Sequence, residues 1–359
     1  MRDVYRVGQV GNGMKTMKAF HVEAPHQFAL IDVPLPQISE DEVLVRVGAN
    51  GICGSDLDVL EGIRPDFCTR YPCVLGHEFA GVIAECGGAA RHFRPGDKVV
   101  IDPILHCMSC RNCRKGWTCQ CEQGYDQLGF TKPGGMQEYT AVPQNLVYML
   151  PEEIDLAAAA LVEPFSCAAN GVQKAAIQPG NSVVIIGLGT IGAGALQIAR
   201  LFSPTHLMVV EVDERKRSAA NKLGATEFIN PQHEDVPSRV RELTKSRGAN
   251  AVIDCSGNLT AVQQSFSYLA TKGRVVMIGI PDRAEFGIPF FQMLQNDASF
   301  FASAGHSTPI WSWVLDLLGN GHFDTDSVIT HRIPLTEIDR AFSLLRDRSE
   351  FAIKVTVCP

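Results

Sequence analysis

The stretch "SVVIIGLGTIGAGALQIARLF", residues 182–202, decides the fold, because it joins an apolar run to a glycine-rich turn and a helical pattern. Residues 182–186 are mostly β-branched and apolar, which is typical of a buried strand. Gly187, Gly189 and Gly192 follow at the spacing G-x-G-x-x-G. These glycines permit a tight turn, close approach of a pyrophosphate and close packing of the helix on the strand. The stretch therefore predicts a dinucleotide-binding unit.

The same alternation of strand-like and helical patterns continues along the chain. Further apolar runs occupy residues 206–210, 250–255 and 273–280. A helical pattern precedes the run at 206–210, and another lies between that run and the one at 250–255. Apolar strands alternating with helices are typical of a parallel sheet covered by helices on both faces. We therefore expect an α/β fold in which residues 169–305 form a doubly wound, Rossmann-type domain.

The segments outside that range have a different character. From Lys18 to about Pro151 the chain is rich in glycine and proline and contains short strand-like runs, which predicts a β-rich, barrel-like domain. Residues 306–359 contain one helical pattern and end in the strand-like run "FAIKVTVCP". We expect residues 1–16 to be a short, poorly ordered extension.

The composition limits the classes of function. The chain has 359 residues, and this length favours two domains over one. Its net charge of −7 argues against a surface for nucleic acid or anionic lipid, because either selects for clusters of lysine and arginine. No apolar run approaches the ~18 residues needed to cross a bilayer, and the first residues lack the apolar core of a signal peptide. We therefore expect a cytoplasmic protein with no membrane or nucleic-acid partner.

Glu211, which follows the second strand-like run at 206–210, indicates which dinucleotide binds. A carboxylate there accepts hydrogen bonds from the ribose hydroxyls and repels a 2′-phosphate, which favours NAD over NADP. Arg215, Lys216 and Arg217 follow closely and weaken this argument, although the surface of a helix explains them equally well. The residues that we expect at the cofactor site are Gly187, Gly189, Thr190, Ile191, Gly192, Glu211, Lys216, Ile278, Gly279, Ile280, Ser303 and Ala304.

A second motif, "HCMSCRNCRKGWTCQC", gathers five of the twelve cysteines. Thiols are kept reduced in the cytoplasm, so such a cluster indicates a metal rather than disulfides. Cys107, Cys110 and Cys113, with Cys119 or Cys121 as the fourth ligand, would form a closed, structural zinc site. The iron–sulfur alternative is disfavoured, because the ferredoxin run continues with a three-residue gap and a proline. The spacing does not decide between the two candidates for the fourth ligand.

Two compact motifs lie upstream of the cysteine cluster, "GICGSD" around Cys53 and "LGHEFAGVIAECG" around His77 and Glu78. A cysteine and a His–Glu pair could complete an open zinc site with three protein ligands and a labile water. Each motif alone is unremarkable, since a single histidine is more often structural.

Taken together, "CGSD", "GHEFAG", the four-cysteine lobe, "GGMQEY", "LVEPFSCA" and "GLGTIG" resemble the zinc-dependent medium-chain dehydrogenase/reductase family in content and order. The resemblance covers the chain from about Lys18 to Pro359, and its polyol (sorbitol) and threonine dehydrogenase branch is the most similar. It implies a GroES-like catalytic domain at 17–168, with the zinc lobe at about 102–123, the inserted Rossmann domain, and a return of 306–359 to the catalytic domain.

The resemblance also implies a set of metal ligands. The family's last lobe cysteine matches Cys121, so that Cys119 is a spare thiol. The catalytic zinc ligands match Cys53, His77 and Glu78. Where alcohol dehydrogenases carry a further cysteine, this chain has Glu163, as polyol dehydrogenases do, and that carboxylate touches zinc directly or through its water. A simple helix N-terminal carboxylate is the alternative reading of Glu163.

Two further positions match residues that act beside the metal. Asp56 matches a residue that orients the His77 ring. Ser55 matches the hydroxyl that first relays the substrate's proton. Many family members have a histidine three residues later, whereas this chain has Asp58. Either water and the ribose hydroxyls carry the proton onward, or the pKa of Asp58 is raised; the sequence leaves both open.

The implied reaction is the transfer of a hydride from a secondary alcohol to NAD, giving the ketone, with one catalytic and one structural zinc per chain. The expected substrate is a polyol, sugar alcohol, cyclitol or amino-cyclitol. L-Threonine is the alternative, with Arg64, Arg70 or Arg91 as a partner for its carboxylate. A catalytically silent NAD- and zinc-binding structural protein is the alternative from another class.

Family members are dimers or tetramers, commonly paired through the segment that matches "ASFFASAG", residues 298–305. The apolar residues around Phe300 and Phe301 fit an interface, although a buried strand would have the same pattern. We expect a homo-oligomer, with a tetramer favoured over a dimer.

Overall fold

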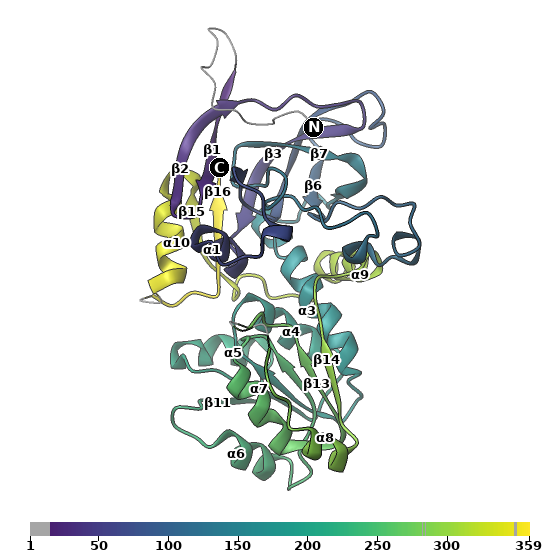
Figure 1. The fold of residues 1–359 in the computed structure, drawn as a ribbon, viewed down its shortest axis with the longest axis vertical. Helices are drawn as coiled ribbons and strands as arrows, with labels where there is room; N and C mark the ends of the chain where they lie inside the picture. Colours follow the sequence, from purple (N-terminus) through teal and green to yellow (C-terminus); the bar gives the residue numbers. More distant parts are fainter. Residues whose placement is uncertain (1–14, 282, 284, 348–349) are drawn as a thin grey trace. The chain divides into compact units, whose positions relative to one another are not determined.

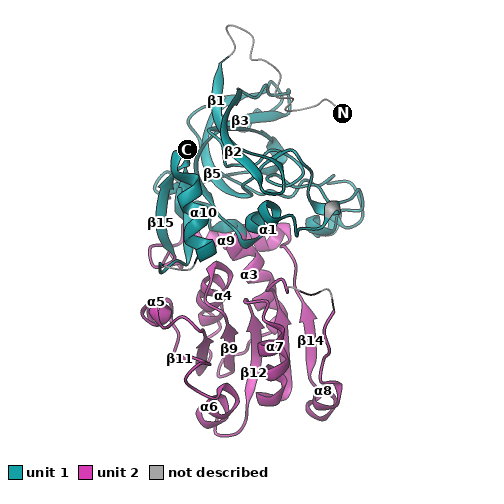
Figure 2. Cartoon of the chain, turned by 60° about the vertical axis from the view of Figure 1, so that its left-hand side comes forward, with its two compact units in different colours: residues 1–163, 329–359 teal, residues 164–328 magenta. Residues whose placement is uncertain are grey.

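A computed structural model describes residues 15–281, 283, 285–347 and 350–359. The chain divides into two compact units (Figure 2). The first unit extends to Glu163 and resumes with Ile329–Pro359, and the second comprises Pro164–Val328. Within the described residues, no helix combines the length and the apolar character that a membrane span requires. The expected extension at 1–16 lies almost wholly outside the described residues.

The first unit is built mainly from β-strands, as the turn-rich sequence predicts (Figure 1). Its larger sheet has the order β15-β16-β3-β5-β6-β8, with β7 also paired to β3, and a smaller sheet has the order β2-β1-β4. The strands are β1 (Thr16–Ala24), β2 (Gln27–Pro34), β3 (Glu42–Gly51), β4 (Cys73–Val74), β5 (Glu78–Cys86), β6 (Lys98–Ile101), β7 (Tyr139–Pro143), β8 (Val147–Met149), β15 (Ile329–Pro334) and β16 (Lys354–Cys358).

Short helices and the end of the chain complete this unit: α1 (Gly54–Glu61), α2 (Leu156–Ala159) and α10 (Ile338–Asp347). The return of the chain is structural rather than peripheral, because β16 pairs antiparallel with β3 through Thr356 and Val357. Phe342 of α10 packs on Phe20 of β1, with ring centroids 5.2 Å apart. The last segment therefore supplies part of the core around which the first unit folds.

The second unit contains a parallel sheet in the order β11-β10-β9-β12-β13-β14. Its strands are β9 (Ser182–Ile186), β10 (His206–Val210), β11 (Glu227–Ile229), β12 (Ala249–Asp254), β13 (Leu269–Met277) and β14 (Ser299–Ala302). Its helices are α3 (Val162–Ala175), whose first two residues belong to the first unit, α4 (Thr190–Arg200), α5 (Arg217–Leu223), α6 (Val236–Leu243), α7 (Leu259–Ser265), α8 (Phe290–Asn296) and α9 (Thr308–Gly319). The strand order is that of a doubly wound dinucleotide-binding fold, which confirms the predicted fold class.

The boundary between the second unit and the last segment of the first lies later in the chain than the sequence predicts. In the structure the second unit ends at Val328, whereas the predicted boundary falls between residues 305 and 306. The reason is that residues beyond 305 pack on the second unit: the Phe323 and Phe165 ring centroids are 4.8 Å apart, and the Asp324 amide donates to Gln197 Oε1 at 2.7 Å. The helical pattern at 308–319 carries no signal that assigns it to either unit.

Candidate active site and metal centres

The catalytic motif begins where β3 ends and α1 begins, within the first unit. Cys53 is the N-cap residue of α1, and its backbone amide donates to Asp56 Oδ2 at 2.8 Å. The Asp56 carboxylate is fully buried. This bond fixes the first turn of the helix, so that the Cys53 thiol and the Asp56 carboxylate are held in a defined relation to each other.

His77 and Glu78 approach the same point from the start of β5, and both are buried. His77 Nδ1 lies 3.4 Å from Asp56 Oδ1. Burial lowers the pKa of the His77 imidazole, but the Asp56 carboxylate outweighs burial and raises that pKa well above its usual value. Because Nδ1 faces Asp56, Nε2 is the nitrogen left to bind a metal.

The structure brings Cys53, His77 and Glu78 together, with one potential ligand atom of each within 4.8 Å of the others. A thiol, an imidazole and a carboxylate are the donor types that zinc prefers. The three residues fit a catalytic zinc ion, and three protein ligands leave a position for substrate.

A buried lysine completes this site, and no motif in the sequence predicts it. Lys354 of β16 is 2% exposed, and its Nζ forms an ion pair with Glu78 Oε2 and donates to the Ile52 carbonyl oxygen at 2.9 Å. Gly51 makes room for this pair, because a Cβ atom there would lie 2.2 Å from Glu78 Oε2. The sequence feature that could have indicated this lysine is its position as the single charged residue in the apolar run at 351–357.

The remaining expected catalytic residues are placed as follows. Glu163 lies at the start of α3, is 8% exposed, and falls outside the group formed by Cys53, His77 and Glu78. Ser55 is half-buried in the first turn of α1. Asp58 lies one turn further, where burial raises the pKa of its carboxyl group and the charge of Arg64 partly opposes that rise.

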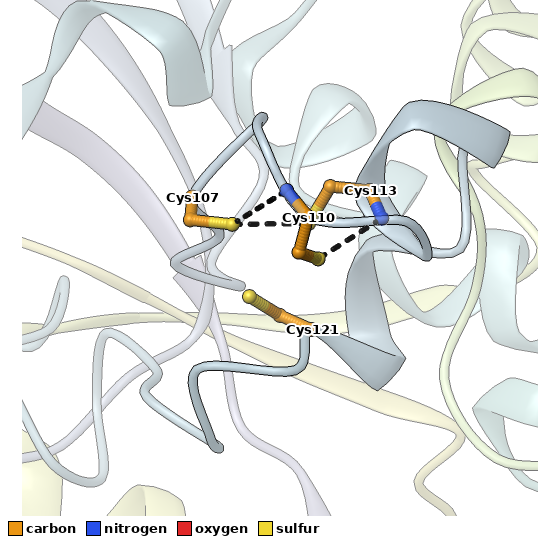
Figure 3. Close-up of side chains that lie close together, drawn as sticks. All are labelled: Cys107, Cys110, Cys113 and Cys121. Carbon is orange, nitrogen blue, oxygen red and sulfur yellow. Dashed lines mark hydrogen bonds between the residues drawn. The ribbon is translucent and has the colours of Figure 1, made fainter.

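The second metal centre is the cysteine lobe of the first unit, shown in Figure 3. The structure brings Cys107, Cys110, Cys113 and Cys121 together, and Cys119 is not part of the group. The Cys107 and Cys113 sulfurs are 3.9 Å apart. A tetrahedron with Zn–S bonds of about 2.3 Å places its sulfurs about 3.8 Å apart, so the four thiols fit one zinc ion.

Backbone amides point at the sulfurs of this lobe. The Cys110 amide donates to Cys107 Sγ at 3.3 Å, and the Cys113 amide donates to Cys110 Sγ at 3.4 Å (Figure 3). Hydrogen bonds from Ser109 and from the Cys110 amide lower the pKa of the Cys107 thiol to about 5, whereas burial raises the pKa of Cys113 to about 12. The amides thus favour the thiolate forms of Cys107 and Cys110.

The glycine motif of the second unit lies at the carboxyl end of β9. Gly187 has a φ of 85°, a conformation that favours glycine, and Gly189 is the N-cap residue of α4, with open space where a Cβ atom would lie. A Cβ atom on Gly192 would lie 2.0 Å from the Gly187 carbonyl oxygen. The glycines therefore have the turn-forming and close-packing roles that the sequence predicts, and Thr190 and Ile191 form the first turn of α4.

Glu211 lies beside this turn, and its carboxylate is bound to the backbone. Glu211 Oε2 accepts a hydrogen bond from the Leu188 amide at 2.7 Å, and Oε1 accepts one from the Asp213 amide at 3.0 Å. Lys216 Nζ lies 3.3 Å from Oε2, whereas Arg215 is paired with Asp213. The Glu211 carboxylate thus binds the backbone of the glycine-rich turn. Of the three basic residues that follow it, Lys216 is the one paired with this carboxylate.

The other expected cofactor residues follow the neighbouring strands. Ile278, Gly279 and Ile280 come directly after β13, and a Cβ atom on Gly279 would lie 2.1 Å from the Gly257 amide nitrogen. Ser303 and Ala304 come directly after β14. All of them lie at the carboxyl edge of the sheet, where doubly wound folds bind ligands at the point between β9 and β12 where the strand order reverses.

Comparison with known proteins gives two matching family models. The model described as the alcohol dehydrogenase GroES-like domain matches residues 39–152, and the zinc-binding dehydrogenase model matches residues 190–320. The first model covers Cys53, His77, Glu78 and the four-cysteine lobe. The second covers the strands β10 to β14 of the parallel sheet.

Similar proteins match over nearly the whole chain. Erythritol/L-threitol dehydrogenase of Mycolicibacterium smegmatis is 31% identical over 361 residues, which cover 96% of this chain and 98% of that protein. Sorbitol dehydrogenase of Bacillus subtilis is 29% identical over 350 residues, 96% of this chain and 98% of that protein. A solved zinc-binding dehydrogenase of Sinorhizobium meliloti, bound to NADP, is 31% identical with a TM-score of 0.88, covering 96% of this chain and all of that chain.

Proposed function

The chain belongs to the zinc-dependent medium-chain dehydrogenase family, in its polyol branch, and we propose that it oxidises a polyhydroxylated secondary alcohol with NAD at the sites described above. It is an enzyme acting on CH–OH donors, and its reaction takes a polyol to the ketone with a nicotinamide cofactor. The observation that carries the proposal is the convergence of Cys53, His77 and Glu78 in the β-rich unit. The particular alcohol, the choice of NAD and the role of each residue are our proposals.

Cys53 and His77 are the protein's fixed ligands for the catalytic zinc in this proposal, and Glu163 and Glu78 supply carboxylates. Glu78 is the carboxylate that converges with Cys53 and His77, although its Oε2 also pairs with Lys354, and Glu163, which lies outside that group, would reach the metal directly or through its water. A zinc ion held by these residues would lower the pKa of the substrate hydroxyl, and a bound nicotinamide cofactor would supply the hydride acceptor. Asp56 keeps His77 in the tautomer that presents Nε2.

The proton of the substrate hydroxyl leaves through Ser55 in this proposal. Asp58, three residues further along α1, then receives it. Its raised pKa supports this role, because a carboxyl group with an ordinary pKa near 3.9 is a poor proton acceptor at neutral pH. Of the two routes that the sequence leaves open, the structure supports the one through Asp58.

The four-cysteine lobe binds a second, structural zinc in this proposal. Its ligands are all protein thiols, so no position remains for a substrate. Glu211 selects NAD, because a buried carboxylate beside the glycine-rich turn repels a 2′-phosphate. The test is kcat/KM for NAD and NADP on one substrate; a preference for NADP would show that Lys216 outweighs Glu211.

We propose a cytoplasmic homo-oligomer, with a tetramer favoured over a dimer. All twelve cysteines lie in the described part of the chain, and none of them forms a disulfide there, which suits a reducing compartment. β14, which contains Phe300 and Phe301, is an edge strand of the parallel sheet and can pair with a second copy. Light scattering that gives the mass of a 39.1 kDa monomer would refute the oligomer.

The experiment that tests the function is a substrate panel with the zinc-loaded protein and NAD. Initial rates are measured on sorbitol, erythritol, a cyclitol, L-threonine and ethanol. Carboxylate ligands tolerate additional oxygen ligands better than thiolates do, so a substrate with neighbouring hydroxyls is favoured. We expect the polyols and the cyclitol to rank above threonine, with ethanol last. A highest kcat/KM for threonine or ethanol overturns the substrate class, and a silent protein gives no NADH with any of them.

A further inference from the structure

We propose that Arg64 binds an anionic group of the substrate, a carboxylate or a phosphate, so that this dehydrogenase prefers acidic polyols to neutral ones. The proposal rests on the polyol dehydrogenase function proposed above and adds to it the chemical class of the substrate. Arg64 would then be a specificity-determining residue that contacts the substrate away from the reacting carbon.

Arg64 follows α1, the helix whose N-cap residue is the metal ligand Cys53 (α1 in Figure 1). α1 ends at Gly62, whose φ of 71° turns the chain. The amides of Ile63 and Arg64 both donate to the Asp58 carbonyl oxygen, at 3.0 and 3.3 Å, so the chain folds back against the last turn of the helix. A loop held in this way keeps the side chain of Arg64 near the helix that presents Cys53.

The guanidinium of Arg64 lies one aromatic ring away from the metal-binding histidine. Its central carbon is 3.8 Å from the centroid of the Phe130 ring, which is buried. The Phe130 and His77 ring centroids are 4.6 Å apart. Arg64 Nη2 also donates to Tyr125 Oη at 3.2 Å, and Tyr125 Oη donates to Gln127 Oε1. Stacking on one ring and bonding to another fix the guanidinium more firmly than an exposed arginine.

The charge of this guanidinium is not matched by a paired carboxylate. No ion pair joins Arg64 to an acidic side chain among the described residues, and in that part of the chain Arg64 Nε is buried without a hydrogen-bond partner. Asp58 is near enough for the Arg64 charge to lower the pKa of its carboxyl group, but burial outweighs that charge and raises the pKa, and no ion pair joins the two residues. A fixed guanidinium with donors to spare is suited to bind a carboxylate or phosphate through two hydrogen bonds.

The distances favour a small acidic substrate. The Arg64–Phe130 and Phe130–His77 separations together limit the gap between the guanidinium and the zinc ligand to one that a chain of a few carbon atoms can bridge. In this proposal a polyol of five or six carbons presents a hydroxyl to the metal and a terminal acid to Arg64. Arg70 and Arg91 are exposed, and neither side chain has a comparable aromatic contact among the described residues.

The test compares three substrates with the same six-carbon chain: sorbitol, gluconate and sorbitol 6-phosphate. They are assayed with the zinc-loaded wild type, Arg64→Gln, Arg64→Lys and the matched control Arg70→Gln. We expect gluconate or sorbitol 6-phosphate to exceed sorbitol in kcat/KM for the wild type. Arg64→Gln should lower the value for that acid about 10- to 100-fold, the range for hydrogen bonds to a charged group, and change sorbitol by less than about threefold. Arg64→Lys should recover part of the loss, and Arg70→Gln should resemble the wild type.

Each outcome bears on one proposal or the other. If sorbitol is preferred to both acids, or if Arg64→Gln slows all three substrates equally, Arg64 has no role in binding an anion. The ranking of gluconate and sorbitol 6-phosphate separates a carboxylate from a phosphate. If no substrate is oxidised, the proposed function fails, and calorimetric binding of the two acids to the zinc-loaded protein still tests Arg64. Binding that is lost in Arg64→Gln and kept in Arg70→Gln supports the anion site, and binding unchanged or absent in all variants overturns it.

Discussion

Lys354→Met is expected to be among the most destabilising single substitutions in the β-rich unit. The change removes the cation that faces Glu78 and the donor to the Ile52 carbonyl, while both the lysine and the glutamate are almost wholly buried. Breaking a buried pair from one side costs about 3–5 kcal/mol, because the remaining charge has no partner. For a unit of this size that cost corresponds to a fall in Tm of roughly 10 °C.

The assay is differential scanning calorimetry at neutral pH, with every variant freed of zinc by the same chelator, so that no zinc ion replaces Lys354 beside Glu78. Lys272→Met is the matched control, since Lys272 is an exposed lysine in an ion pair with Asp297 and such pairs contribute about 0–1 kcal/mol. The double variant Glu78→Gln/Lys354→Met should recover much of the loss, because it removes both charges. A Lys354→Met protein as stable as the control, or a double variant no more stable than Lys354→Met, would refute the reasoning.

Three further predictions concern the metal lobe, the packing around Glu78 and the response to acid. Cys110→Ser should release one zinc ion per chain and lower Tm, whereas Cys119→Ser should keep both ions; iron with acid-labile sulfide in the wild type would contradict the zinc assignment. Gly51→Ala should lower stability, because its Cβ would meet Glu78 Oε2, whereas Gly54→Ala, with open space at its Cα, should be neutral; equal Tm values would exclude the clash. Burial raises the pKa of Asp155, but its bonds to Arg332 and to the Ala157 and Ala158 amides lower it below the ordinary value. The stability that Asp155 contributes is therefore present above its ordinary pKa of about 3.8 and lost as pH falls through the lowered one, so Tm of the wild type and of Asp155→Asn should converge only below about pH 4.

The parts of the fold that the sequence predicts are those specified by neighbouring residues. Gly187 needs a positive φ and Gly192 needs space against the Gly187 carbonyl, so the motif and its strand–turn–helix context identify a local structure by themselves. The lobe is similar, since amides within the run Cys107–Cys113 bind its sulfurs. Local geometry of this kind can be predicted from a short segment of the sequence, because all the residues that determine it lie within that segment.

The features that the sequence does not reveal depend on residues far apart in the chain. Lys354 and Glu78 are separated by 276 positions, and β16 must pair with β3 before the lysine reaches the glutamate. The stacking of Phe130 on His77 likewise depends on the fold of the whole β-rich unit. The boundary after Val328 also depends on packing, because Phe323 and Asp324 bind to residues of the second unit. Neither periodicity nor motif spacing reports such contacts.

The measurement that tests the central claim most directly is the rate of NADH formation from a polyol before and after zinc is removed. The wild type should lose its activity to a chelator that strips the Cys53–His77 site and regain it when zinc is added back. Cys53→Ser should stay inactive under both conditions while still binding NADH, because the glycine motif lies in the other unit. A wild-type rate that survives complete loss of zinc, or a Cys53→Ser protein with wild-type turnover, would contradict the account.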